Sequence, residues 1–473
     1  MVHDNKLYSE LKVGDTASII RVCTANDLYI FAHASGNVNP LHLPSDDADG
    51  TAEAIAPSMW VGALVSSVLG NILPGAGTLY RSQSFRFLNR AHLGDALTVT
   101  VTVRDKGADG LVVLDTIVTG RDGEKIAEGV AEVLAPTHKV HSDDDPLPGI
   151  VVQRHGHFDR LLKACEGLEP LATAVAVPED KASLGGALLA ARHGIIRPIL
   201  VGCAKTIAAV AKEIAGNLEG VEIIDIPDPD AAAGMAVELA RTGKAAALMK
   251  GRLHTDELLH HVVQRDGGLR TSRRLSHVFV MDVPGLDHLL LVSDAAINIA
   301  PDLMAKVDIT QNAIDVALAL GFVLPKVGIL SAVETVNPQI PSTIDAAVLT
   351  KMADRGQIKG GIVDGPLAMD NAVDIEAART KGITSLVAGR ADILIVPNLE
   401  AGNMLAKELV FVAHAEAAGI ALGATVPIIL TSRADSEKAR LASCAIAALY
   451  REWRSRGDGR SHARSRAVAE AAE

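Results

Sequence analysis

Polar residues end several short apolar runs in the second half of the chain, and some of them could hold an anion. They follow the runs at 245–249, 327–330, 361–363, 393–396 and 426–430, and they are Lys250, Ser331, Asp364, Asn398, Ser432 and Arg433. If these runs are parallel strands, ligands are expected beyond their carboxyl ends. Each position alone is better explained as the polar exit of a buried strand. Their number, with an ammonium and a guanidinium among them, favours an anion site.

The elements that would carry these residues alternate between strand and helix from about residue 158 onward. Further apolar runs occur at 171–177, 197–202 and 221–226, and Ala- and Leu-rich segments such as 181–193 and 230–242 read as helices. Apolar runs separated by helix-length segments predict parallel strands that are buried on both faces. So many strands favour an α/β domain of two lobes that face a cleft.

The first 135 residues have a different period. Residues 96–104 alternate between apolar residues and Thr, and 111–119 and 125–134 continue the pattern. This alternation predicts an antiparallel meander with one buried face. The apolar stretch 59–73 predicts a central helix, with Ser58 as its cap. We therefore expect an α+β domain at 1–136, a linker at 137–157, the α/β domain at 158–455 and a polar tail at 456–473.

Composition excludes several classes of protein. The 473 residues carry 45 Lys and Arg against 57 Asp and Glu, a formal charge of −12, which disfavours nucleic acid and anionic membranes as partners. No apolar run reaches the roughly 20 residues of a membrane helix, and the polar start predicts no secretion signal. Four scattered cysteines suit a reducing cytoplasm and predict no metal site. Neither a GxxxxGK[ST] nor a GxGxxG loop is present, which disfavours ATP and NAD.

Four ordered motifs in the second half resemble the phosphate acetyltransferase and phosphate butyryltransferase family. They occupy 330–334, 364–370, 396–403 and 430–436. The resemblance implies two α/β lobes of the isocitrate-dehydrogenase-like kind with the active site between them. It also implies the reaction acyl-CoA + phosphate ⇌ acyl phosphate + CoA, with coenzyme A as a substrate, no bound cofactor and a homo-oligomeric enzyme.

This resemblance assigns roles to the candidate residues. Arg433 would hold phosphate and transition-state charge, Ser432 would bond the acyl or phosphate oxygen, and backbone amides near Gly402 and Asn403 would add donors. The other strand-end residues would bind substrate, namely Lys250, Ser331, Asp364 and Asn398.

The base is less evident, because the acetyltransferase branch has an aspartate seven residues after the motif serine and Ala439 stands there in this chain. Asp435 or Glu437 could replace that aspartate. Asp435 is equally explained as a helix N-cap.

The first domain resembles the MaoC-like hot-dog proteins, the (R)-specific enoyl-CoA hydratases, over the motifs 31–42, 73–80, 82–87 and 94–95. The resemblance implies a CoA-thioester site. The family motif has an Asp at the position of Asn37, while its His is retained as His42, and Ser58 replaces a Gly at the start of the central helix. An amide is no base near neutral pH, so we expect weak or absent hydratase activity.

Three functions remain open at this point. The leading one is a phosphate acyltransferase fused to a hot-dog domain of reduced activity. A second is a bifunctional enzyme whose main reaction is enoyl-CoA hydration. The third is an α/β module for ligand sensing or oligomerisation. Ser432 and Arg433 favour catalysis, and Ala439 is the main argument against it.

Overall fold

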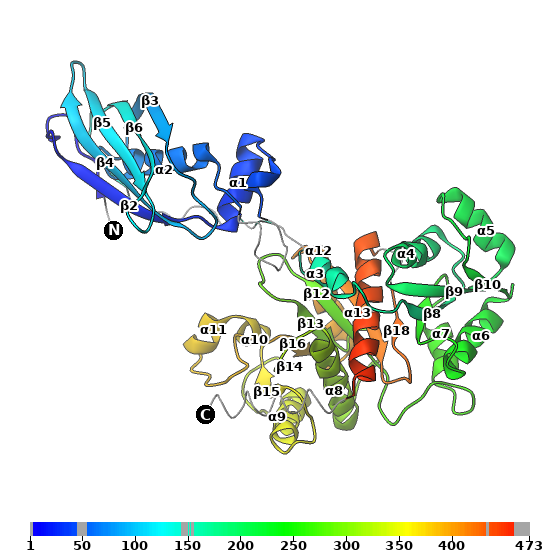
Figure 1. Cartoon of the computed structure of the whole chain (residues 1–473). Coiled ribbons are helices and arrows are strands. Elements are labelled where there is room, and N and C mark those ends of the chain that lie inside the picture. Colours follow the sequence, from blue (N-terminus) through cyan, green and yellow to red (C-terminus); the bar gives the residue numbers. More distant parts are fainter. Residues whose placement is uncertain are drawn as a thin grey trace. The chain divides into compact units, whose positions relative to one another are not determined.

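The computed structural model describes residues 3–44, 54–142, 150, 152, 156–431 and 435–457. They belong to two compact units, 1–152 and 153–473 (Figure 1). No helix in these described segments has both the length and the apolar character needed to cross a membrane.

The N-terminal unit is an antiparallel sheet with the strand order β2-β4-β5-β6-β3 and one long helix against it (Figure 1). Leu97, Val99, Val101 and Val103 of β4 are buried and alternate with less buried residues, as the period-two pattern predicts. Helix α2 packs against this apolar face. The arrangement is the predicted hot-dog fold. Its elements are β1 His3–Asp4, β2 Thr16–Val22, α1 Ala25–Ser35, η1 Pro40–His42, α2 Ser58–Asn71, β3 Leu79–Phe87, β4 Ala96–Lys106, β5 Leu111–Thr119, β6 Lys125–Leu134 and β7 His141–Ser142.

Helix α2 begins one residue earlier than the sequence predicts. Pro57 is its N-cap, and no side chain caps the helix there. Ser58 is the first helical residue, so its predicted capping role is wrong. The ring of Pro57 fixes its φ near −55°, but it supplies no hydrogen bond to the first N–H groups of the helix.

The C-terminal unit is built on an 11-stranded sheet with the order β10-β9-β8-β11-β18-β17-β12-β13-β16-β14-β15. The first five strands of this order are parallel to one another, and so are the last four. The strands are β8 Leu171–Ala176, β9 Ile196–Gly202, β10 Glu222–Asp225, β11 Ala247–Lys250, β12 Ser276–Asp282, β13 Leu290–Ser293, β14 Lys326–Leu330, β15 Ile362–Leu367, β16 Ile393–Ile395, β17 Glu416–Leu422 and β18 Ile428–Ile429.

Three antiparallel pairings join the two parallel halves into one sheet. β18 pairs with β17, β17 with β12, and β12 with β13. The α/β class with parallel strands is confirmed, but β12, β13 and β17 were not predicted. Because the number of antiparallel pairings is odd, the strands of the two halves run in opposite directions.

Helices cover both faces of this sheet (Figure 1). α13 and α8 contact each other and pack in one core cluster with β12 and β17. The side chains of α13 are largely buried from Ala439 to Tyr450. The helices are α3 His157–Ala164, α4 Lys181–Arg192, α5 Ala204–Glu213, α6 Pro229–Arg241, α7 Thr255–Val262, α8 Leu303–Ala319, α9 Pro341–Asp354, α10 Met369–Val373, α11 Ile375–Thr380, α12 Leu399–Phe411 and α13 Glu437–Ser455.

The close approach of β3 and β6 gives a first prediction. A Cβ atom on Gly129 of β6 would lie 1.9 Å from the backbone oxygen of Ser84 in β3, so Gly129→Ala must push the strands apart. We expect it to destabilise the N-terminal unit by about 2 kcal/mol or more. Hydrogen–deuterium exchange of β3 and β6 in the full chain measures this. Gly70→Ala in α2 is the matched control, because its Cβ would meet nothing within 4 Å. Equal exchange in the two variants would contradict the prediction.

Candidate active-site elements

Lys250 and the start of the 430–436 motif lie side by side at the carboxyl ends of two neighbouring inner strands, β11 and β18. β11 and β18 are parallel; Leu248 pairs with Ile428 and Met249 with Ile429. Lys250, the next residue of β11, is therefore level with Leu430. The Lys250 Nζ atom donates to the backbone oxygens of Gly251 and Leu253 at 3.4 and 3.3 Å. These two carbonyls hold the ammonium at the strand end.

Ser432 and Arg433 lie outside the described residues, but the structure describes both ends of their segment. Thr431 is only 4% exposed, and α13 begins at Glu437 with Ser436 as its N-cap. The Ser436 Oγ atom accepts a hydrogen bond from the backbone N–H of Ala439 at 3.0 Å. The alternative that Asp435 is the N-cap is therefore wrong. Asp435 stands one residue before the cap, partly buried.

Arg440 is a residue of this region that the sequence analysis missed. Its side chain is 4% exposed, and its Nη1 donates to Thr431 Oγ1 at 3.1 Å. Gly186 of α4 leaves the space for it, since a Cβ there would lie 3.1 Å from Arg440 Cδ. The signal in the sequence is an arginine between the apolar neighbours Ala439 and Leu441. The buried guanidinium of Arg440 is thus hydrogen-bonded to Thr431, the residue that precedes Ser432.

Ser331 and Asn398 lie together in the other half of the sheet. β14 and β16 are parallel and pair at Ile329 with Ile395, so Ser331 is level with Pro397. Ser331 Oγ lies 2.8 Å from Ser342 Oγ. Asn398 is the N-cap of α12, and its Oδ1 accepts the backbone N–H of Ala401 at 2.9 Å. That oxygen is therefore engaged by the helix.

The sequence predicts that Asp364 follows a strand, but this is wrong: Asp364 lies inside β15, which continues to Leu367. It pairs in register with Gly328, and its Oδ1 accepts the N–H of Gly365 at 2.8 Å. The apolar run 361–363 predicts a strand that ends before Asp364. β15 is the edge strand of the sheet, where a proline removes no essential ladder bond.

Gly402 serves packing in this structure. Its backbone N–H donates to Asn398 O at 3.1 Å within α12, so this N–H is already used by the helix. A Cβ on Gly402 would lie 2.6 Å from Val396 Cγ2 and 3.0 Å from Ala295 Cα. Asn403 Nδ2 donates to Ala295 O at 3.4 Å. Both residues hold α12 against the segment that follows β13.

A buried turn around Asp294, also missed by the sequence analysis, closes the end of β13. Asp294 is 2% exposed, and its carboxylate accepts the backbone N–H groups of Ala296, Ile297 and Asn298 at 3.0, 3.1 and 3.1 Å and Asn298 Nδ2 at 2.6 Å. His277 is buried nearby. Burial lowers the pKa of His277 to about 4, although the Asp294 charge opposes this shift. The imidazole is therefore neutral near pH 7.

The candidate residues of the α/β unit thus form two groups. Lys250 and Thr431 lie at the carboxyl ends of strands in one half, and Ser331 and Asn398 at the carboxyl ends of strands in the other. Since the halves run in opposite directions, strand order alone does not bring the groups together. In the described residues, no group of three or more His, Cys, Asp or Glu side chains is arranged to hold a metal ion.

The candidate residues of the N-terminal unit lie in and around η1 and at the start of α2. His42 lies in η1, and its Nδ1 is 2.7 Å from Ile55 O. A carbonyl only accepts, so Nδ1 carries the proton and Nε2 is left as the acceptor nitrogen. Asn37 is exposed and accepts the N–H of Asn39 at 3.3 Å, and Ser58 is exposed at the start of α2.

Solved structures resemble each unit. The branched-chain phosphotransacylase from Enterococcus faecalis V583 is 31% identical, with a TM-score of 0.52, over 59% of this chain and 99% of that chain. An R-hydratase from Pseudomonas aeruginosa is 36% identical, with a TM-score of 0.31, over 32% of this chain and 100% of that chain.

Curated sequences match the C-terminal unit. The phosphate acetyltransferase of Rhizobium meliloti is 61% identical over 293 residues, 62% of this chain and 93% of the relative. The phosphate butyryltransferase of Clostridium acetobutylicum is 44% identical over 292 residues, 62% of this chain and 97% of the relative. The family model described as phosphate acetyl/butaryl transferase matches residues 229–448. The chain belongs to this family of phosphate acetyl- and butyryltransferases.

Proposed function

We propose that the C-terminal unit interconverts acyl-CoA and phosphate with acyl phosphate and CoA, for an acetyl or butyryl group. The observation that carries the proposal is the 61% identity to a phosphate acetyltransferase across almost the whole length of that relative. A phosphate oxygen attacks the thioester carbon, and the tetrahedral intermediate collapses with loss of the CoA thiolate, which takes a proton.

The cations at the end of β11 and β18 suit this reaction. Both substrates are anionic, and attack places further negative charge on the acyl oxygen. Arg433 supplies a planar pair of donors for phosphate, and Ser432 a hydroxyl for the acyl or phosphate oxygen. Lys250 lies level with the residue before Thr431 and adds an ammonium. Ser331, Asn398 and Asn403 remain the proposed substrate contacts of the other half.

In the reverse direction, in which CoA attacks the acyl phosphate, Asp435 is the proposed base that takes the thiol proton. Ala439 is 4% exposed and apolar, so it contributes no proton transfer. Asp435 stands between the Ser432–Arg433 pair and the Ser436 cap. A thiol with a pKa near 8.5 needs only modest help to lose its proton near pH 7.

Replacement of the motif arginine tests the function. Arg433→Gln removes both the charge and the paired donors, so we expect phosphate-dependent thiol release from acetyl- and butyryl-CoA to fall at least 100-fold. Arg433→Lys keeps the charge and should lose less. The exposed Arg192→Gln at the end of α4 is the control. Activity of Arg433→Gln within tenfold of the wild type would remove Arg433 from this role.

The buried arginine gives a separate prediction. Arg440→Met deletes the donor to Thr431 but fills much of the same space, so we expect a fall in kcat of about tenfold with a smaller change in KM. Arg440→Lys should recover part of kcat, because it returns the cation. Arg440 would then position Thr431 and the residues after it. A change in KM without a change in kcat would contradict this role, and so would a folded Arg440→Lys variant whose kcat is no higher than that of Arg440→Met.

We infer that the N-terminal unit is a CoA-thioester domain with weak or absent hydratase activity. His42 presents an acceptor nitrogen, but Asn37 cannot act as a base. Asn37→Asp should raise crotonyl-CoA hydration at least tenfold and leave phosphate-dependent thiol release unchanged. Vigorous hydration by the wild type that is lost in His42→Ala would instead favour the bifunctional alternative.

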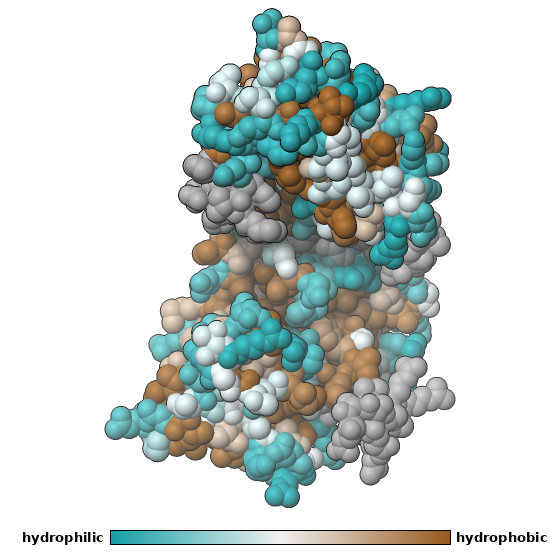
Figure 2. Space-filling view, turned by 90° about the vertical axis from the view of Figure 1, so that its left-hand side faces the viewer, coloured by the Kyte–Doolittle hydropathy of each residue, from teal (hydrophilic) through white to brown (hydrophobic). Residues whose placement is uncertain are grey.

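We also propose that the chain forms homo-oligomers. Figure 2 shows apolar residues among polar ones on the viewed faces of the molecule. Large apolar side chains are exposed on β3, on α12 and just after α12: Leu79, Phe87, Met404, Phe411 and Val412. Exposed apolar side chains of this kind are suited to contacts between copies.

A further inference from the structure

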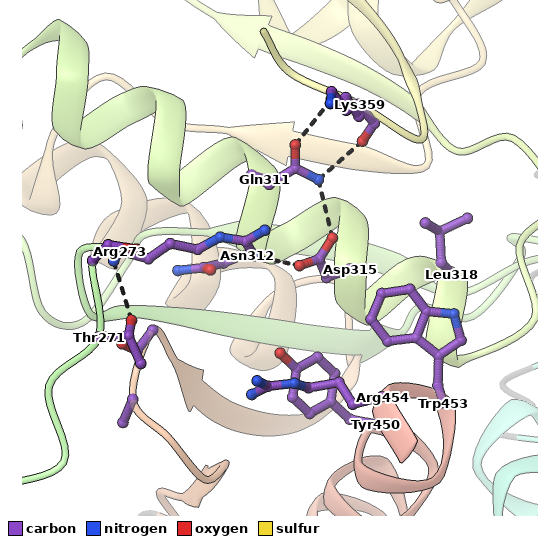
Figure 3. Close-up of a pocket in the computed structure, with 13 residues that line it drawn as sticks. Thr271, Arg273, Gln311, Asn312, Asp315, Leu318, Lys359, Tyr450, Trp453 and Arg454 are labelled. Carbon is purple, nitrogen blue, oxygen red and sulfur yellow. Dashed lines mark hydrogen bonds and ion pairs between the residues drawn. The ribbon is translucent and has the colours of Figure 1, made fainter. Parts of the chain in front are cut away.

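A cavity of about 420 Å³ opens at the carboxyl-terminal end of α13, and none of the motifs lines it (Figure 3). Its walls come from the loop before β12, from α8, from the loop before β15 and from the end of α13. The volume is within the range of small-molecule sites. The side chains that the argument uses are Arg273, Gln311, Asp315, Lys359, Trp453 and Arg454.

The cavity gathers positive charge in an acidic protein. Arg273 forms an ion pair with Asp315. Lys359 and Arg454 also line the cavity, and neither lies within 4 Å of a carboxylate in the described part of the chain. Three cations therefore face one carboxylate, although the whole chain carries −12. Such a hollow attracts an anionic ligand.

Aromatic rings form one wall of the same cavity. The Tyr450 and Trp453 ring centroids are 6.0 Å apart. The Arg454 guanidinium lies 5.9 Å from the centre of the Tyr450 ring, which is 4% exposed. Trp453 is only partly buried and points toward the cavity beside Leu318 (Figure 3). A flat ligand ring can stack on such a side chain.

Hydrogen bonds fix the backbone of the two loops that carry Arg273 and Lys359. Gln311 accepts the backbone N–H of Lys359 at 2.9 Å and donates to Lys359 O at 2.9 Å and to Asp315 Oδ1 at 3.0 Å. Thr271 donates to Gly423 O at 2.6 Å and accepts the N–H of Arg273 at 3.1 Å. The loops on both sides are therefore fixed, which lowers the entropic cost of binding.

The cavity is distinct from the proposed catalytic segment. Ser436 and Tyr450 are 14 residues apart along α13, which is about 21 Å at the rise of an α-helix. Ser432 and Arg433 precede Ser436, whereas the cavity lies beyond Tyr450.

We propose that this cavity is a second binding site, for a nucleoside diphosphate. The base stacks on Trp453, and the phosphates contact Arg273, Lys359 and Arg454. CoA carries the same adenosine diphosphate chemistry, so a free nucleotide and CoA are both sources of such a ligand.

Tryptophan fluorescence tests the proposal, because the chain has only Trp60 and Trp453. In the full-length Trp60→Phe variant, ADP should quench the signal of Trp453 to saturation, and adenosine or inorganic phosphate alone should bind at least tenfold more weakly. Calorimetry on the wild-type chain gives the same comparison if Trp60→Phe folds poorly. No saturable ADP binding by either method would overturn the proposal.

The double variant Lys359→Gln, Arg454→Gln separates this cavity from the catalytic site. It should bind ADP at least tenfold more weakly and keep wild-type thiol release. Lys351→Gln, which removes an exposed lysine of α9 outside the cavity, is the matched control. CoA is the second arm. Saturable quenching of Trp453 by CoA in the Trp60→Phe variant, in competition with ADP, assigns the cavity to CoA, because its adenine would stack as that of ADP does. Quenching by ADP and not by CoA assigns the cavity to a free nucleotide. Unchanged ADP binding in the double variant overturns the site and leaves the acyltransfer proposal untouched.

Discussion

The packing of α13 against the middle of the 11-stranded sheet is the constraint on which the C-terminal unit depends. Its buried residues share one core cluster with β12, β17 and α8. Arg440 extends this contact to the end of β18 through its bond to Thr431. A buried guanidinium is costly unless its donors are satisfied, so this position of α13 is specified by a polar contact as well as by apolar burial. Thr431, which directly precedes the proposed catalytic residues, is therefore fixed to the core.

The sequence predicts the parallel strands well and the antiparallel ones poorly, for a physical reason. Strands buried on both faces read as continuous apolar runs, and those at 171–177, 326–330 and 393–396 were found in this way. β12 and β13 contain short apolar runs, at 278–281 and 290–292, but only a short loop separates them, so they lack the strand–helix alternation that marks the other strands. β17 is rich in Ala and Gly, which do not mark a strand. The pairing of β12 with β17 joins segments that are more than 130 residues apart, and it leaves no local pattern in the sequence. When these antiparallel strands are not recognised, the two parallel halves are predicted as two separate lobes.

The same limit applies to the candidate residues. Lys250 lies near Thr431 because the strands β11 and β18 are parallel neighbours in the sheet. The sequence shows both apolar runs, but it does not show which strands are neighbours. The apolar run 361–363 places Asp364 after the strand, whereas β15 continues through Gly365 and Pro366, which an edge strand tolerates. The resemblance implies amide donors near Gly402, but it does not show that the Gly402 N–H is used within α12. The contacts of Gly402 with Val396 and Ala295 depend on tertiary packing, which one motif does not reveal.

The position of Ala439 narrows the choice of a base. Ala439 lies in the first turn of α13, 4% exposed, and its N–H is held by the Ser436 cap. A carboxylate at this position would be buried next in sequence to Arg440, and its pKa would depend on that guanidinium. With alanine there, Arg440 has no adjacent carboxylate in α13 and donates to Thr431. Asp435, which we propose as the base, precedes the Ser436 cap and is only partly buried, so it lies outside the buried face of the helix. The way in which α13 begins is therefore compatible with the proposed role of Asp435.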